Sequence, residues 1–410
     1  MTSDLLTVKL DKLTYGGAAL GRLSDGRAAF VPFGLPGEKV RIRTIDEKRG
    51  HVLAELVEVQ EPSPDRIAPK CKHFGICGGC HYQHLSYRTQ LPAKTEILRD
   101  QLWRIGKIED PPVKNIISSS SEWNYRNHVQ FHLTRDASLG FIDSHSRSVM
   151  SITECHLPEP ALNELWPELK FDPDLGLERV SLRLGIEEET MLVLESGSPE
   201  PPELELEAPL SVVHLYGNDG IVMAGDDHLN MKVNDRIFCV SAASFFQVNN
   251  VMAGKMVAYL LENFPVTTKT TLLDIYCGVG LFSAFFAARC GRLIGIEASP
   301  SACEDFTVNL EEFDNVELFE APAEVVLPNL KDKTDVVIVD PPRSGMEKRA
   351  LEALLMLGPG RIGYVSCDPS TLARDAARFI AGGYHLRHVT PFDLFPQTSS
   401  IESISIFERR

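Results

Sequence analysis

The sequence is poor in cysteine and has no long apolar run. Nine cysteines in 410 residues are too few and too unevenly spaced for a disulfide scaffold. The chain has no stretch of about 18 apolar residues, the usual signature of a membrane-spanning helix. The N-terminal residues MTSDLLTVKLDK lack the charged-then-apolar order of a secretory signal. We therefore expect a cytoplasmic protein that has no membrane partner.

Positive charge is also scarce, because 41 Lys and Arg face 57 Asp and Glu, for a net charge of −16. The deficit is uneven. Residues 1–113 hold 17 Lys and Arg and 14 Asp and Glu, whereas the remainder holds 24 and 43. Phosphate binding depends on the charge at the contact, so a basic N-terminal third is compatible with an RNA partner.

The length predicts two or three domains. Residues 5–60 contain short alternating runs separated by glycine turns, the pattern of a small antiparallel barrel. The proline-rich segment 61–70 reads as a linker, and 86–105 has helical spacing. From about 115 to 235 the runs indicate a second, mostly β domain.

From about residue 236 strands alternate with helical segments. Runs such as TLLDIYCGVG, RLIGIEAS, DVVIVDPP and RIGYVSCD are rich in β-branched residues, and each precedes a stretch long enough for a crossover helix. This pattern predicts a mainly parallel, Rossmann-like sheet, whose ligands bind beyond the carboxyl ends of the strands. The expected fold class is therefore α/β plus β.

The segment LLDIYCGVGLFS, 272–283, predicts a nucleotide-type cofactor site. A strand ends near Asp274, Gly278 and Gly280 follow, and Glu297 ends the next strand, where it can accept ribose hydroxyls. A dinucleotide fingerprint would have a third glycine, but Ser283 stands there. The spacing favours S-adenosylmethionine, and turn glycines in another α/β domain are the alternative.

Two further strand ends carry reactive side chains. Asp340 begins DPPRSG, whose two prolines fix a rigid turn that would direct the carboxylate to the ligand crevice, unless the motif is only a structural turn. Cys367 lies in VSCDPSTLARD, after another buried strand. A lone strand-end cysteine is more often inert than reactive. A nucleophilic role requires ionisation, so we expect a lowered pKa, helped by the helix that STLARD begins.

Cys71, Cys77 and Cys80 form C-x5-C-x2-C, and Cys155 is available as a fourth ligand. Such density in a cytosolic chain indicates a metal site, since zinc and iron–sulfur clusters both take thiolates. His73, His81 and His84 are spare ligands for zinc. Spacing alone does not choose between zinc and an iron–sulfur cluster.

The ordered motifs CKHFGICGGC, Cys155, SFFQVN, LLDIYCGVG, IEAS, DPPRSG, VSCDPSTLARD and LFPQTSSIES resemble the RNA 5-methyluridine (uracil-C5) methyltransferase family, over nearly the whole chain. The N-terminal segment resembles the TRAM domain, an OB-like RNA-binding barrel. The resemblance implies an S-adenosylmethionine-dependent enzyme that methylates C5 of a uridine in ribosomal or transfer RNA. Large-subunit ribosomal RNA is slightly favoured, with the T-loop uridine of transfer RNA as the alternative.

The resemblance also implies roles for individual residues. Cys367 is the nucleophile that adds to C6 of the base, and Glu402 is the proton acceptor. The implied contacts to the methyl donor are Gln247, Tyr276, Glu297 and Asp340. The implied ligands of a 4Fe–4S cluster are Cys71, Cys77, Cys80 and Cys155.

The resemblance implies a domain division. The TRAM barrel covers residues 1–62, the central iron–sulfur β domain 63–92 and 115–235, and the catalytic domain 93–114 and 236–410. Nothing in the sequence requires a protein partner, so we expect a monomer.

The RNA contacts are expected from an aromatic and from barrel cations. Phe245 or Phe246 could stack on a displaced base, although core packing is an equal alternative, and Arg41, Arg43, Lys48 and Arg49 lie on the predicted barrel.

Three departures from the family pattern involve Leu281, Gln397 and Ser400; the last two replace imidazoles that could meet the substrate. The rival functions are an amino-methyltransferase, which needs no thiolate, and a non-catalytic RNA-binding protein.

Overall fold

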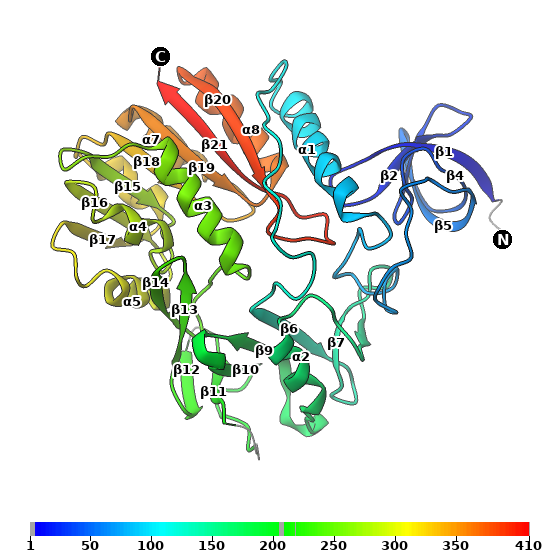
Figure 1. Ribbon diagram of the computed structural model, residues 1–410, viewed down its shortest axis with the longest axis horizontal. Coiled ribbons are helices and arrows are strands. Elements are labelled where there is room, and N and C mark those ends of the chain that lie inside the picture. The colour runs from blue at the N-terminus through cyan, green and yellow to red at the C-terminus, as the bar shows by residue number, and fades with distance from the viewer. Residues whose placement is uncertain (1–4, 205–208, 218, 410) are drawn as a thin grey trace.

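The structure is a computed structural model that describes residues 5–204, 209–217 and 219–409. It contains an N-terminal barrel, a central β sheet and a large α/β unit, with helix α1 (Tyr87–Arg104) between the barrel and the α/β unit (Figure 1). No helix in these ranges is both long and apolar enough to span a bilayer.

The barrel is closed in the order β1-β2-β3-β5-β4, and β3 and β5 are its parallel pair. Its strands are β1 (Leu6–Leu13), β2 (Ala19–Arg22), β3 (Ala28–Val31), β4 (Lys39–Glu47) and β5 (His51–Glu61). Along β1 the side chains of Val8 and Leu10 are buried while their neighbours are exposed, as the period of two requires. The predicted small barrel is thus confirmed.

The central domain is built on a seven-stranded sheet of order β12-β11-β10-β9-β6-β7-β8. Its strands are β6 (His128–Leu133), β7 (Leu139–Ile142), β8 (Val149–Ser151), β9 (Leu177–Leu184), β10 (Thr190–Ser196), β11 (Ser211–Tyr216) and β12 (Asp219–Ala224). Helix α2 (Pro160–Leu165) and the short 3-10 turn Trp166–Glu168 pack on this sheet through Leu162 and Trp166. Two further 3-10 turns are Pro173–Leu175 and Ile186–Glu188. The hairpin β13 (His228–Val233) and β14 (Arg236–Ser241) follows.

The α/β unit has a second seven-stranded sheet, of order β17-β16-β15-β18-β19-β21-β20. Its parallel strands are β15 (Thr271–Ile275), β16 (Arg292–Glu297), β17 (Val316–Glu320), β18 (Val336–Val339) and β19 (Arg361–Ser366). The antiparallel strand β21 (Glu402–Arg409) lies between β19 and β20 (Tyr384–Phe392). The predicted Rossmann-like sheet is confirmed.

Helices cover both faces of this sheet. One face carries α3 (Asn250–Asn263), α4 (Leu281–Phe286) and α5 (Pro300–Asn309). The other carries α1, α6 (Ala323–Val326), the 3-10 turn Leu327–Asn329, α7 (Lys348–Leu357) and α8 (Pro369–Ala381). Neighbouring residues of β15 face opposite layers, since Leu272 packs with the first set and Leu273 with the second. With both faces covered, the free edge for a ligand is the one at the strand ends.

Helix α1 is continuous despite Pro92 in its first turn and a half. It passes through the predicted boundary between residues 92 and 93. Its Leu98 and Leu102 pack in the core of the α/β unit, whereas Ile97 packs in the core of the barrel. Buried Lys94 donates to Asp393 Oδ1 at 2.6 Å and to the Phe395 carbonyl at 2.9 Å. The helix therefore joins the barrel to the α/β unit.

Candidate active site

A cleft of about 1240 Å³ opens at the carboxyl ends of the parallel strands. Eleven of the residues singled out in the sequence line it: Phe245, Phe246, Gln247, Tyr276, Gly278, Leu281, Glu297, Asp340, Cys367, Ser400 and Glu402. They come from six segments of the chain, and the sheet order brings those segments together.

The loop after β15 has an unusual backbone that opens one wall of the cleft. Tyr276 has φ = +63°, a left-handed conformation that is strained for a tyrosine. Gly280 (φ = +90°) has no room for a side chain, since a Cβ there would lie 2.4 Å from Leu310 Cδ1. A Cβ at Gly278 would meet nothing within 4 Å. The loop is therefore packed behind Gly280 and open at Gly278, where a ligand can approach the backbone.

Glu297 ends β16 and is fixed by three backbone donors. The amide of Gly278 donates to Oε2 at 2.9 Å, and the amides of Ala298 and Ser299 donate to Oε1 at 2.7 and 2.8 Å. The carboxylate is thus oriented before any ligand arrives, and its remaining lone pairs face the cleft that it lines.

Asp274 lies beneath the loop and does not line the cleft, unlike the other predicted cofactor residues. Its Oδ2 accepts a hydrogen bond of 2.6 Å from Ser283 Oγ, and its Oδ1 has no partner among the described residues. Burial raises the pKa of this carboxyl to about 7. Its contact is with the residue where a dinucleotide site would have its third glycine.

Cys367 follows β19 and precedes the N-cap of α8. Its surroundings contradict the expected thiol acidity. Burial, together with the carboxylates of Glu402 and Asp340, raises the pKa of the thiol to about 12, and the guanidinium of Arg343 acts in the opposite direction. The expectation of a lowered pKa is therefore wrong, because the helix terminus is outweighed by desolvation and two nearby carboxylates.

Glu402 begins β21 and is buried, with 6% of its surface exposed. Burial raises its pKa well above the usual value, and nearby Asp340 adds to this effect. Burial likewise raises the pKa of Asp340 to about 7. Glu402 is therefore not a solvated surface charge. Cys367, Asp340 and Glu402 form one electrostatically coupled group.

Four arginines line the cleft, and none was singled out in the sequence: Arg126, Arg343, Arg374 and Arg378. Arg343, the arginine of DPPRSG, counters the carboxyl groups around Cys367. Arg126 lies over the ring of Phe395 and has a buried Nε without a partner in the described part of the chain. The DPPR motif could have indicated Arg343, whereas no local pattern marks Arg126.

The two phenylalanines of SFFQVN have different environments. Phe245 is 72% exposed and lines the cleft, whereas Phe246 is 9% exposed and packs against Phe238. Gln247 lines the cleft beside them. Of the two predicted stacking candidates, only Phe245 is free to meet a base.

The three residues that depart from the family pattern lie in different environments. Gln397 is buried, with φ = +68°, and exchanges hydrogen bonds with Gln90 of α1. Gln397 therefore has a structural position between the C-terminal segment and α1. Ser400 and Leu281 line the cleft.

The four cysteines of the predicted cluster approach one another from two loops. The thiol of Cys80 is influenced by the charges of Cys77 and Cys155, and burial raises its pKa to about 12. The amide of Gly79 donates to Cys77 Sγ at 3.4 Å. Nevertheless, within the described ranges no three His, Cys, Asp or Glu side chains are close enough to hold one metal ion.

Three of the four barrel cations that were expected to contact RNA are each paired with a carboxylate. Arg41 pairs with Glu58 and Arg43 with Glu55, both at 3.1 Å, and Lys48 pairs with Asp46 at 2.9 Å. All are exposed. Arg49 belongs to the same exposed turn region.

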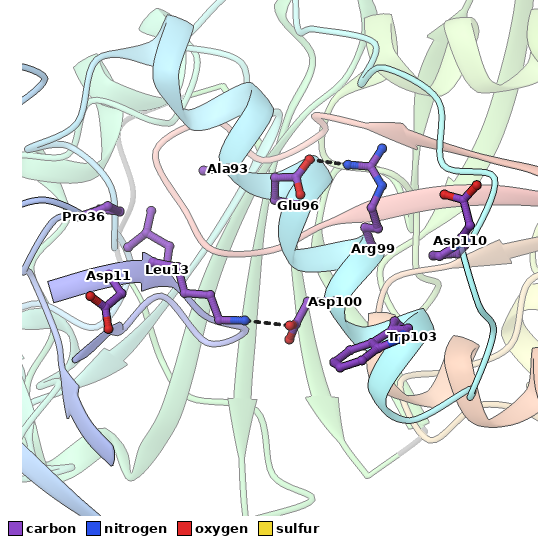
Figure 2. A pocket seen from close by; sticks show the side chains of 11 residues that line it. Asp11, Leu13, Pro36, Ala93, Glu96, Arg99, Asp100, Trp103 and Asp110 are labelled. Carbon is purple, nitrogen blue, oxygen red and sulfur yellow. Dashed lines mark hydrogen bonds and ion pairs between the residues drawn. The ribbon is translucent and has the colours of Figure 1, made fainter. Parts of the chain in front are cut away.

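A second cavity of about 550 Å³ lies between β1 and α1 (Figure 2). Lys12 and Asp100 meet across it at 2.7 Å, and Arg99 pairs with Glu96. It contains no residue that the sequence motifs singled out.

The fold and the cleft define a methyltransferase-type α/β enzyme with an added barrel. Residues 221–410 match the family model described as tRNA (uracil-5-)-methyltransferase, and residues 4–57 match the TRAM domain. An RNA methyltransferase of Aquifex aeolicus, described as uncharacterized, is 35% identical over 98% of this chain and 98% of its own. One from Halalkalibacterium halodurans is 32% identical over 99% and 97%.

Among solved structures, the Pyrococcus abyssi tRNA (uracil-54, C5)-methyltransferase in complex with S-adenosyl-L-homocysteine superimposes with a TM-score of 0.75. It is 25% identical and covers 98% of this chain and 99% of its own. The chain belongs to the RNA (uracil-5-)-methyltransferase family, whose members are S-adenosylmethionine-dependent enzymes.

Proposed function

We propose that this enzyme methylates C5 of an unpaired or flipped uridine in RNA through a covalent bond between Cys367 and C6 of the base. The proposal rests on one observation: Cys367, Glu402 and Glu297 line the same cleft. An amino-methyltransferase would have no use for this thiol.

The residues of the donor pocket are Gln247, Tyr276, Glu297 and Asp340 in our proposal. S-adenosylmethionine, when bound, supplies an electrophilic methyl group and a positive charge. Fixed Glu297 accepts the ribose hydroxyls, and the open backbone at Gly278 allows close approach. Asp274 lies below this loop, and we propose that it supports the loop.

The chemistry proceeds in two stages on the base. The Cys367 thiolate adds to C6, and the electron pair of the 5,6-bond moves into an enolate shared between C5 and the 4-oxygen, so that C5 can attack a methyl group. The methylated C5 still carries its proton. Glu402, as carboxylate, accepts this proton, the 5,6-bond re-forms, and the C6–sulfur bond breaks to return the thiolate.

The raised pKa values of Cys367 and Glu402 mean that both groups resist ionisation at neutral pH. A thiol with a pKa of about 12 is almost wholly protonated at neutral pH. Arg343 lowers the pKa of the thiol and of Glu402. Positive charge near Cys367 therefore favours the thiolate that the reaction needs.

The RNA contacts follow from exposure at the mouth of the cleft. Phe245 is the exposed aromatic next to the donor pocket and would stack on the displaced uracil. The guanidinium of Arg126, which also lines the cleft, would contact the base or its phosphate. We propose only a secondary role for Arg41, Arg43 and Lys48, because each has a carboxylate partner.

The chemistry is tested with RNA that carries 5-fluorouridine at candidate sites. Fluorine at C5 cannot leave as a proton, so the adduct should persist and be mapped to Cys367 by mass spectrometry. A transfer RNA T-loop follows the P. abyssi relative, and a large-subunit ribosomal RNA fragment follows the expectation from the sequence. Formation of 5-methyluridine without any adduct would overturn the mechanism. Failure to methylate RNA extracted from cells lacking this protein would overturn the function.

We further propose that Cys71, Cys77, Cys80 and Cys155 hold a 4Fe–4S cluster within the central domain. The four thiols influence one another's pKa, and backbone amides lie near the sulfurs of Cys77 and Cys155. Such amides stabilise cluster thiolates. A cluster spreads its ligands more widely than one zinc ion does, which fits cysteines that converge without a single-ion site.

The cluster proposal is tested by anaerobic purification and metal analysis. Iron and acid-labile sulfide in equal amounts, both lost in Cys80→Ser and retained in Cys239→Ser, are expected. Stoichiometric zinc in their place would overturn it.

A further inference from the structure

The barrel reaches the catalytic cleft through one tyrosine. Tyr15 lies in the turn between β1 and β2, and its hydroxyl donates a hydrogen bond of 2.5 Å to Asp368 Oδ2. Asp368 follows Cys367 directly in the sequence. A residue near the start of the chain is thus connected to the neighbour of the nucleophile.

The two carboxylate oxygens of Asp368 have different hydrogen-bond partners. Oδ1 accepts from the amides of Ser370 and Thr371 at 2.8 and 3.0 Å and so caps α8. Oδ2 receives the Tyr15 hydroxyl. Burial and the Asp368 carboxylate raise the pKa of Tyr15, which keeps the phenol protonated as a donor at neutral pH. The N-terminus of α8, and with it the Cys367 turn, is therefore held from the barrel side.

The barrel is itself anchored to the catalytic unit, so the bond acts from a fixed support. Ile401, the residue before Glu402, is buried in the barrel's apolar core together with Ile97 of α1. In Figure 1 the red segment that precedes β21 extends toward the end of α1 on the barrel side. Lys12 pairs with Asp100 of α1 nearby. The residues adjacent to both proposed catalytic groups thus contact the barrel.

We propose that Tyr15 is a positioning residue of the reaction: the barrel, beyond any part in RNA binding, holds Cys367 in its attacking position through the Tyr15–Asp368 hydrogen bond. The inference depends on the proposed function for the role of Cys367. A hydrogen bond to a carboxylate is among the stronger ones in proteins, and small displacements of a nucleophile are costly in rate.

Tyr15→Phe removes the hydroxyl and keeps the ring, and Tyr216→Phe, at the exposed end of β11, is the matched control. The first measurement is amide hydrogen exchange of residues 370–373 in the full chain without RNA. Tyr15→Phe should exchange faster here and Tyr216→Phe should not. Unchanged exchange would remove the physical basis of the proposal, whether or not the protein methylates uridine.

The second measurement separates positioning from RNA contact. In single-turnover methylation at saturating RNA, Tyr15→Phe should be slower by roughly 10-fold, with the RNA dissociation constant unchanged. Weaker RNA binding at an unchanged rate would make Tyr15 an RNA contact and overturn the proposal. If the wild-type protein forms no 5-methyluridine, the proposed function fails, and the exchange result still decides whether Tyr15 holds the turn.

Discussion

The outer face of the barrel and the cleft of the α/β unit use charge in opposite ways. On the barrel, exposed cations and carboxylates face each other across neighbouring strands, as in Arg41–Glu58 and Arg43–Glu55. In the cleft, Cys367, Asp340 and Glu402 are buried near one another, and burial raises the pKa of each. The number of charges, which the sequence shows directly, says little about where reactive groups lie, because burial creates the reactivity.

The comparison predicts the largest effect at Cys367. Cys367→Ala should lower methylation by about 10⁴-fold or more, since the step that activates C5 is lost. The loss should leave donor binding, measured by calorimetry, within a few-fold of wild type. Cys239→Ser, a partly exposed thiol outside the cleft, is the control and should remain active. If the Cys367→Ala enzyme remains active, the amino-methyltransferase alternative would explain the activity better than the proposed mechanism.

Glu402→Gln should give the next largest effect. Turnover should fall by roughly 10²- to 10⁴-fold because no carboxylate accepts the C5 proton. The covalent methylated intermediate should accumulate on ordinary RNA, as a band of reduced mobility on denaturing gels. Glu408→Gln, at the solvent-exposed end of the same strand, should behave as wild type. Equal loss of adduct and product would instead indicate that Glu402 acts before the addition step.

Substitution of Asp274 should have a smaller effect, which appears as a change in the pH dependence of the unfolding free energy. Its pKa in the folded protein is about 7, above the ordinary 3.8, so the folded state favours the protonated form. Its stabilising contribution is complete below the unfolded pKa and is lost as pH rises through about 7. Urea denaturation should therefore show a smaller fall in unfolding free energy between about pH 5 and about pH 8 for Asp274→Asn than for wild type. An identical pH dependence in both proteins would contradict the assigned protonation.

The barrel face should give the smallest effect. Arg41→Ala with Arg43→Ala should weaken RNA binding by less than about 10-fold, because each cation must leave a carboxylate before it can neutralise a phosphate. Filter binding at several salt concentrations measures this change. Removing the partners, by Glu55→Gln with Glu58→Gln, should instead strengthen binding. Weaker binding in the Glu variants would mean that the pairs themselves shape the RNA surface.

Much of the fold was open to prediction because it depends on local patterns. The alternation in β1, the βα repeats from β15 onward and the helical spacing of α1 each reflect which side chains must be buried. The donor loop was identified for the same reason, since its glycines and Glu297 lie within one β-loop-α-β segment.

The remainder of the site depends on contacts between distant segments. The role of Arg126 and the hydrogen bond from Tyr15 to Asp368 arise only when three domains are assembled. The thiol acidity of Cys367 was predicted with the wrong sign. The adjacent helix is visible in the sequence, whereas the carboxylates of Asp340 and Glu402 reach the thiol only through the order of the strands.

The burial of Ile401 in the barrel has a consequence for the order of folding. A ribosome produces β1 to β5 long before it produces residue 401, and until then the apolar surface that Ile401 covers is open to water. The barrel reaches its final packing only when the segment that precedes β21 arrives, and the same arrival delivers Glu402 to the cleft. The barrel and the active site therefore complete their folding together, late in the synthesis of the chain.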